Sequence, residues 1–242
     1  MAKFAGDRPQ DILKTPMSNS VVRDCQPDPE RLLPFQECME SYGIDADAGS
    51  RDPHDPRGEW PHNCVSTQTV AYSCGIISRA KDTVEHNHEA AELERCRRLA
   101  YAAAEIMAAV PVGLGSESED YFRPFFVTAS QGDAAPAVIT ENTVRAAFGG
   151  TLYPPAQISV AELAATGEWW QQMAKTDAAT RQAWHDLIKW FERQDELKAA
   201  AFVEIGSDPL SQHNSGCVFP RLAVALTAAG SLVGICGYVV YT

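Results

Sequence analysis

The sequence predicts an α+β protein in which helices precede and separate antiparallel strands. Two amphipathic helices are expected, over Glu89–Val110 and over Ala178–Gln194, and the C-terminal region has the pattern of three strands, the last two forming a hairpin. These three observations predict a layered domain of roughly 150 residues, over 89–242.

Residues 1–88 differ in composition from this domain. Eight of the 15 prolines precede residue 65, in segments such as Gln26-Pro27-Asp28-Pro29 and Asp52-Pro53-His54-Asp55-Pro56. Such segments bury too little apolar surface to offset the entropy lost on ordering. We therefore expect an N-terminal extension, rich in proline and containing cysteine, that is mostly irregular or poorly ordered.

The first elements of the domain follow from periodicity and from helix-ending residues. The helix over Glu89–Val110 ends at Pro111 and Gly113. Its apolar positions recur at three- and four-residue steps: Leu93, Cys96, Leu99, Ala100, Ala103, Ile106, Met107 and Val110. The aromatic and β-branched run Tyr121–Ser130 predicts a strand, and Thr140–Phe148 predicts a short helix.

The remaining elements alternate between helix and strand. Ser159 and Glu162 have the spacing of a capping box, which predicts a helix that begins there and continues to about Ala165. The helix over Ala178–Gln194 has a strong apolar stripe, formed by Trp184, Leu187, Ile188 and Phe191. Three strands complete the domain: Ala200–Ile205, Phe219–Thr227 and Leu232–Tyr241.

The run Leu222–Val240 carries no charge and approaches the length of a membrane span. Gly230 and Ser231 interrupt it, and its many β-branched residues favour strand over helix. A hairpin explains these residues better than a membrane-spanning helix does. The membrane-spanning helix stays open as the alternative.

The chain is strongly acidic. Its 32 acidic and 20 basic residues give a net charge of −12. Such a surface repels phosphate backbones, so we do not expect direct binding to nucleic acid. The same charge suits a basic partner, such as an enzyme that holds nucleic acid.

The cysteines and the N-terminus bear on the compartment. The seven cysteines are an odd number, and no signal-peptide pattern opens the chain. We therefore expect mostly reduced thiols and a cytoplasmic location.

Few residues have a pattern that predicts catalysis. Cys64, Cys74, His86 and His88 are all possible zinc ligands, but no Cys-x-x-Cys pair accompanies them. No nucleophile elbow or cysteine-protease signature is present. We therefore do not expect an enzyme, and the alternative is a metal-dependent N-terminal segment for which the domain is a scaffold.

Three acidic features are candidates for partner binding. Ser116-Glu117-Ser118-Glu119-Asp120 follows the long helix, and Glu168 precedes two tryptophans, Trp169 and Trp170, in an expected loop. A tryptophan is usually buried, although an exposed one beside an acid is typical of an interface hot spot. Thr242 ends the printed sequence, and its carboxylate and hydroxyl oxygens are donors that Mg²⁺ accepts.

These features together resemble the nuclease A inhibitor family, over roughly Ala90–Thr242. The resemblance rests on Gly113-Leu114 leading into Ser116–Glu119, on Glu168-Trp169-Trp170, and on the C-terminal hairpin Ala229–Thr242. It implies a three-layer α/β/α sandwich of the PR-1-like type with a mainly antiparallel sheet.

The resemblance also implies a function. It implies a protein inhibitor of a Mg²⁺-dependent, sugar-nonspecific nuclease of the ββα-metal type, with no cofactor of its own. By this likeness, Thr242 bridges to the partner's Mg²⁺, Glu117 contacts the enzyme near its catalytic centre, and Glu168 and Trp169 complete the contact surface. The alternative is an interaction module of the same fold with a partner that is not a nuclease.

Overall fold

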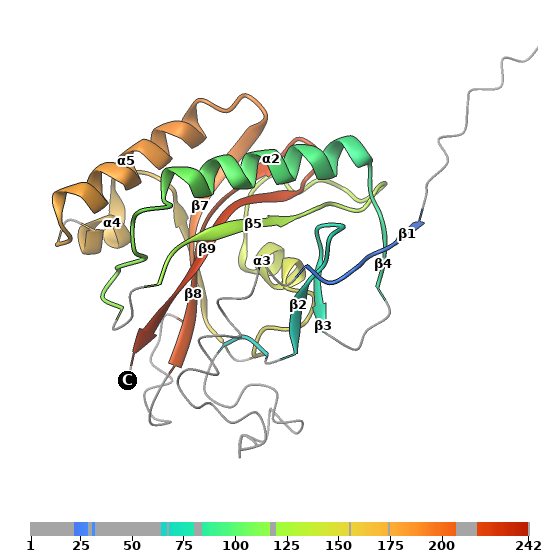
Figure 1. Ribbon diagram of the computed structural model, residues 1–242, viewed down its shortest axis with the longest axis horizontal. Coiled ribbons are helices and arrows are strands. Elements are labelled where there is room, and N and C mark those ends of the chain that lie inside the picture. Colours follow the sequence, from blue (N-terminus) through green and yellow to red (C-terminus); the bar gives the residue numbers. More distant parts are fainter. Residues whose placement is uncertain are drawn as a thin grey trace, which may run out of the picture.

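The computed structural model describes residues 22–28, 31, 64–66, 68–79, 84–116, 120–154, 156–173, 175–206 and 217–241. These residues combine helices with a mostly antiparallel sheet, which confirms the expected α+β class. Figure 1 shows the strands of this sheet crossing the centre of the molecule, with helices packed against them.

The main sheet has five antiparallel strands in the order β5-β9-β8-β7-β6. Their bounds are β5 Arg123–Val127, β6 Ile158–Glu162, β7 Leu197–Ile205, β8 Cys217–Thr227 and β9 Leu232–Tyr241. The predicted β8–β9 hairpin is confirmed, with Leu226 opposite Leu232 at its closed end. The alternative of a membrane-spanning helix over Leu222–Val240 is therefore wrong, because Gly230, at a φ of 92°, turns the chain back on itself.

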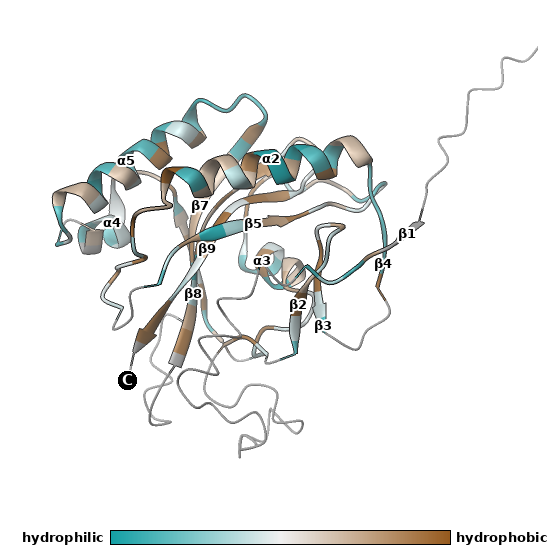
Figure 2. Ribbon diagram, viewed as in Figure 1, coloured by the Kyte–Doolittle hydropathy of each residue, from teal (hydrophilic) through white to brown (hydrophobic). Residues whose placement is uncertain are grey.

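Helices lie on both faces of the sheet. Phe126 of β5 packs in one cluster with Leu99 of α2 (Ala90–Ile106). Its neighbour Phe125 points to the opposite face, where its ring lies 5.8 Å from that of Phe148, just after α3 (Glu141–Ala147). Figure 2 shows hydrophobic colour along β8 and β9 and mixed colours on the helices, as expected for a sheet covered on both faces.

The two long helices confirm their predictions. The expected core positions Cys96, Leu99, Ala100 and Ala103 of α2 are buried. So is the predicted stripe of α5 (Ala178–Glu192), namely Trp184, Leu187, Ile188 and Phe191. Asp177 caps α5, because its Oδ1 accepts hydrogen bonds from the backbone N–H groups of Ala179 and Thr180.

Two local predictions are wrong. The segment from Ser159 to Glu162 belongs to strand β6, paired with β7, and does not begin a helix. The capping-box spacing is outweighed by the β-branched residues Ile158 and Val160 and by pairing with a long neighbouring strand. The expected loop at Gly167-Glu168-Trp169-Trp170 is instead the first half of α4 (Gly167–Met173).

The N-terminal region packs against the domain. Strand β1 (Val22–Asp24) pairs with β4 (Glu85–Asn87), and β2 (Thr69–Ala71) pairs with β3 (Ile77–Arg79). Cys64, Val65, Ala71 and Ile77 are buried in the same core as the main sheet. The division at residue 88 stays a prediction for the whole chain, but residues 64–79 share the core of the domain.

A proline marks the end of the β7–β8 pairing. The register of β8 with β7 runs to Arg221, whereas its register with β9 continues to Cys217. Pro220 has no N–H to donate, and the Arg221 guanidinium donates to the carbonyl of Ile205 instead, at 3.2 Å. Among the residues that the structure describes, β8 pairs beyond this point with β9 alone.

A buried carboxylate joins α2 to the turn of the β8–β9 hairpin. Glu92 is 3% exposed, and its Oε1 accepts hydrogen bonds from Thr227 Oγ1 at 2.5 Å and Ser231 Oγ at 2.7 Å. Its other oxygen pairs with Arg95. Ser231 Oγ also accepts a hydrogen bond from Ala129 N at 3.0 Å, so the contact extends to the chain that follows β5.

Substitution of Glu92 should destabilise the fold. Glu92→Ala leaves the two buried hydroxyls without their charged acceptor, so we expect the free energy of unfolding to fall by about 2–3 kcal/mol. Glu94→Ala, on the exposed face of the same helix, is the control and should change it by less than about 0.5 kcal/mol. If urea titrations gave the same loss in the free energy of unfolding for both variants, this role of Glu92 would be contradicted.

The contribution of Glu92 should depend on pH. Burial pushes the pKa of Glu92 upward, but hydrogen bonds from Thr227, Ser231 and Arg95 outweigh burial, so the pKa lies below the ordinary 4.5. A lowered pKa stabilises the folded state above the ordinary value, and this stabilisation is lost as the pH falls through the pKa of the folded state. The stability difference between the wild type and Glu92→Gln should therefore be constant at neutral pH and shrink below about pH 4.5.

Candidate functional site

The acidic turn after α2 is held against the end of β9. The backbone N–H of Val240 donates to Ser116 Oγ at 3.0 Å, and the Tyr238 hydroxyl donates to Asp120 Oδ1 at 2.6 Å. Figure 1 shows the green segment that follows α2 running along the same side of the molecule as the end of β9. Both ends of the acidic turn therefore lie beside the last residues of the C-terminal strand.

The backbone that leads into this turn is unusual. Gly113, Leu114 and Gly115 have successive φ values of 64°, 54° and 77°, all in the left-handed region. This region is costly for Leu114, whose side chain is buried, so the packing of that side chain must hold it there. The backbone from which the turn begins is therefore fixed, and this reduces the conformational entropy lost when the turn binds a partner.

Two of the predicted site residues, Glu117 and Thr242, lie outside the described residues. Their neighbours Ser116 and Val240 are described and are hydrogen-bonded to each other. The structure thus brings together the segments that carry these two residues, while the roles of Glu117 and Thr242 stay predictions.

Trp169 is not an exposed aromatic residue. It is 3% exposed, its ring stacks on Phe202 at 4.4 Å, and its Nε1 donates to the carbonyl of Glu162. Of the two possibilities that the sequence left open for this indole, burial applies, because α4 turns the side chain onto the sheet, where neighbouring aromatic rings bury it. The adjacent Glu168 is exposed on the first turn of α4.

A chain of aromatic contacts joins α4 to the acidic turn. The Trp169 ring lies 5.4 Å from that of Trp184, which lies 5.3 Å from that of Phe122, two residues after Asp120. Helix α4 and the turn therefore rest on one rigid aromatic support. The structure shows that the side chain of Glu168 is exposed. It also shows that α4, which carries Glu168, is connected to the acidic turn through these aromatic rings.

The possible zinc ligands do not form a metal centre. Cys74 forms a disulfide with Cys25, so it is not available as a ligand. His86 and His88 are buried and stack on each other at 5.2 Å. Within the described ranges, no group of three or more His, Cys, Asp and Glu residues could hold a metal ion.

The disulfide also bears on the expected compartment. Cys96 and Cys236 are buried thiols, whereas Cys25 and Cys74 are oxidised, contrary to the expectation of reduced thiols for this pair. Disulfides persist mainly in oxidising compartments, so this bond does not support the predicted cytoplasmic location. Across the described residues, no helix has the length and apolar character that crossing a membrane requires.

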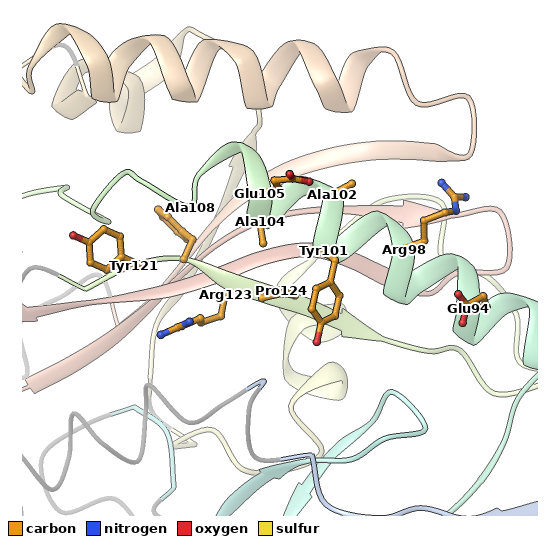
Figure 3. A pocket seen from close by; sticks show the side chains of 11 residues that line it. Glu94, Arg98, Tyr101, Ala102, Ala104, Glu105, Ala108, Tyr121, Arg123 and Pro124 are labelled. Atoms are coloured by element: carbon orange, nitrogen blue, oxygen red, sulfur yellow. The ribbon is translucent and has the colours of Figure 1, made fainter.

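A second surface lies between α2 and the edge strand β5. A groove of about 830 Å³ is lined there by residues that include Tyr101, Tyr121, Arg123 and Pro124 (Figure 3). Tyr101 and Tyr121 are 48% and 43% exposed. Exposed tyrosines in a groove are a feature of protein-binding surfaces, so this is a second candidate interface.

Comparison with known proteins adds no family assignment. The chain matches no model of a known protein family, and no curated protein is detectably similar to it. The likeness to nuclease A inhibitors therefore rests on the residues quoted above and stays a prediction.

The buried position of Trp169 makes a testable difference. Because Trp169 is buried against Phe202 and Trp184, Trp169→Ala should lower the free energy of unfolding by about 3–5 kcal/mol. Glu168→Ala removes an exposed side chain and should lower it by less than about 0.5 kcal/mol. Thermal and urea unfolding of both variants measure the difference, and a stable Trp169→Ala protein would show that the indole is not a core residue.

Proposed function

We propose that this protein inhibits a Mg²⁺-dependent, sugar-nonspecific nuclease of the ββα-metal type by binding as an acidic mimic of nucleic acid. In this proposal, Thr242 reaches the metal ion of the nuclease, and Glu117 and Glu168 contact the enzyme around it. The protein supplies oxygen ligands and negative charge, and the nuclease supplies Mg²⁺. The chain itself needs no catalytic residue.

The observation that carries this proposal is the pairing of the acidic turn with the end of β9. The two contacts, Ser116 with Val240 and Asp120 with Tyr238, hold carboxylate-bearing chain beside the strand that leads to Thr242. A cluster of fixed oxygen atoms is what a metal-bound phosphate would otherwise provide. Because Ser116, Asp120, Tyr238 and Val240, which flank these groups, are held in place before binding, less entropy is lost when the complex forms.

Two broader properties agree with the proposal. The net charge of −12 favours encounter with an enzyme whose active site is built to attract nucleic acid. Helices on both faces of a mainly antiparallel sheet are compatible with the three-layer α/β/α, PR-1-like sandwich implied by the resemblance. The proposal therefore includes a three-layer α/β/α, PR-1-like fold for this domain.

Removal of Thr242 tests the mechanism. We expect the inhibition constant for a ββα-metal nuclease to rise about tenfold or more, ~1.4 kcal/mol or beyond, because the metal loses its protein oxygen ligands. Glu117→Gln and Glu168→Gln should weaken inhibition in the same direction. Glu94→Gln is the matched control, since it removes one charge from α2 outside the proposed surface and should leave the inhibition constant unchanged.

The same titration separates the proposal from its alternative. An inhibition constant that does not respond to loss of Thr242 would reject the metal-bridging mechanism. The alternative is a module that docks a protein other than a nuclease, and the exposed tyrosines of the groove between α2 and β5 favour it. Absence of inhibition in the wild type, together with a partner whose binding is lost in Tyr101→Ala, would support that alternative.

A further inference from the structure

An N-terminal segment is fastened across the outside of β2. We call residues 22–28 together with Arg31 the strap. Asp28 N donates to the carbonyl of Ala71, and Ser73 N donates to the carbonyl of Gln26, both at 2.7 Å. The disulfide between Cys25 and Cys74 adds a covalent link between the strap and the turn that joins β2 to β3.

Arg31 extends the strap to the edge of the main sheet. Its guanidinium donates to the carbonyls of Tyr72 and Phe126 and lies 3.6 Å from the centre of the Phe126 ring. The side chain is buried, and burial lowers the pKa of Arg31 to about 10, so it stays protonated at neutral pH. The strap therefore covers backbone groups of β2 and of β5, which is an edge strand.

Besides the pairing of β1 with β4 and the contact of Arg31 with Phe126, the strap packs in a small apolar cluster that is separate from the main core. Cys25, Tyr72 and Cys74 are its buried members, and Val70, Ile76 and Val84 pack around them. Segments with few buried apolar contacts open locally at a lower free energy than the core does. Detachment of the strap therefore need not disturb the sheet.

We propose that the Cys25–Cys74 disulfide is a redox switch: it locks the strap when oxidised, and its reduction releases the strap and uncovers the edges of β2 and β5. The uncovered groups are the carbonyls of Ala71, Tyr72 and Phe126 and the N–H of Ser73. Exposed strand edges pair readily with another extended chain, so release changes what this face can bind.

The chemistry requires a dithiol reductant. One of its thiolates attacks a sulfur of the protein disulfide and forms a mixed disulfide, while the other protein sulfur leaves as a thiolate. The second thiol of the reductant then attacks the mixed disulfide and releases the second protein sulfur. The protein gains two electrons and two protons, and the reductant becomes a disulfide.

The buried thiols Cys96 and Cys236 do not compete in this exchange. Burial raises the pKa of Cys96 to about 12 and raises that of Cys236 as well, so neither is a thiolate at neutral pH. Since the thiolate is the reactive form, these residues are poor nucleophiles toward the disulfide.

Amide hydrogen exchange of the full chain, with and without dithiothreitol, tests the switch. After reduction, the amides of Asp28 and Ser73 should exchange about tenfold faster or more, while those of Val224 and Ala225 in β8 should change by less than about twofold. The double variant Cys25→Ser/Cys74→Ser should exchange like the reduced wild type and should not respond to dithiothreitol.

Three results would overturn the proposal. Asp28 and Ser73 could keep their protection after mass spectrometry shows complete reduction. The amides of Val224 and Ala225 could exchange faster to the same extent, which would show that the disulfide stabilises the whole fold and not the strap alone. Alkylation of denatured, unreduced protein could label both Cys25 and Cys74, which would show that the bond does not form.

Discussion

The fold depends on a carboxylate that is buried and fully engaged. Glu92 leaves α2 toward the sheet and is met by the hydroxyls of Thr227 and Ser231 at the β8–β9 turn. A charge in such a place is tolerated only when its oxygens are hydrogen-bonded, so helix, turn and the chain after β5 must all be in register before the site is stable. Together with the packing of Leu99 on Phe126, this contact positions the long helix over the sheet and so shapes the groove beside β5.

The other end of the sheet is organised in a different way. There, the backbone N–H of Val240 and the hydroxyl of Tyr238 hold the acidic turn against β9, and a left-handed leucine precedes that turn. The first end contributes to stability through a satisfied buried charge, whereas at the second the half-buried Asp120 is held by the Tyr238 hydroxyl. The second end therefore fixes the residues that flank the segments proposed to bind a partner.

The sequence predicted elements with strong periodicity and missed contacts between distant segments. The stripe of α5 and the β8–β9 hairpin follow from spacing and from Gly230, so both were predictable. Glu92 stands four residues before Cys96 and seven before Leu99, so it lies on the buried face of α2. Nothing local announces, however, that hydroxyls more than a hundred residues away will satisfy this carboxylate. The sequence left open whether Trp169 is buried, because that depends on Phe202, which tertiary packing alone brings to it. Similarly, nothing near Ser116 indicates that Val240 will be its partner, although the acidic cluster itself is visible.

Pro220 has a consequence for the shape that a partner would meet. Because pairing with β7 stops at Arg221 while pairing with β9 continues, the sheet narrows toward the end of β9. Adjacent strand axes are about 5 Å apart, so a pair of strands spans about a quarter of the width of a five-stranded edge. The buried side chains of Val218, Phe219, Val239 and Val240 show that other parts of the protein cover this narrower end, so a partner would meet the segments that flank the two strands.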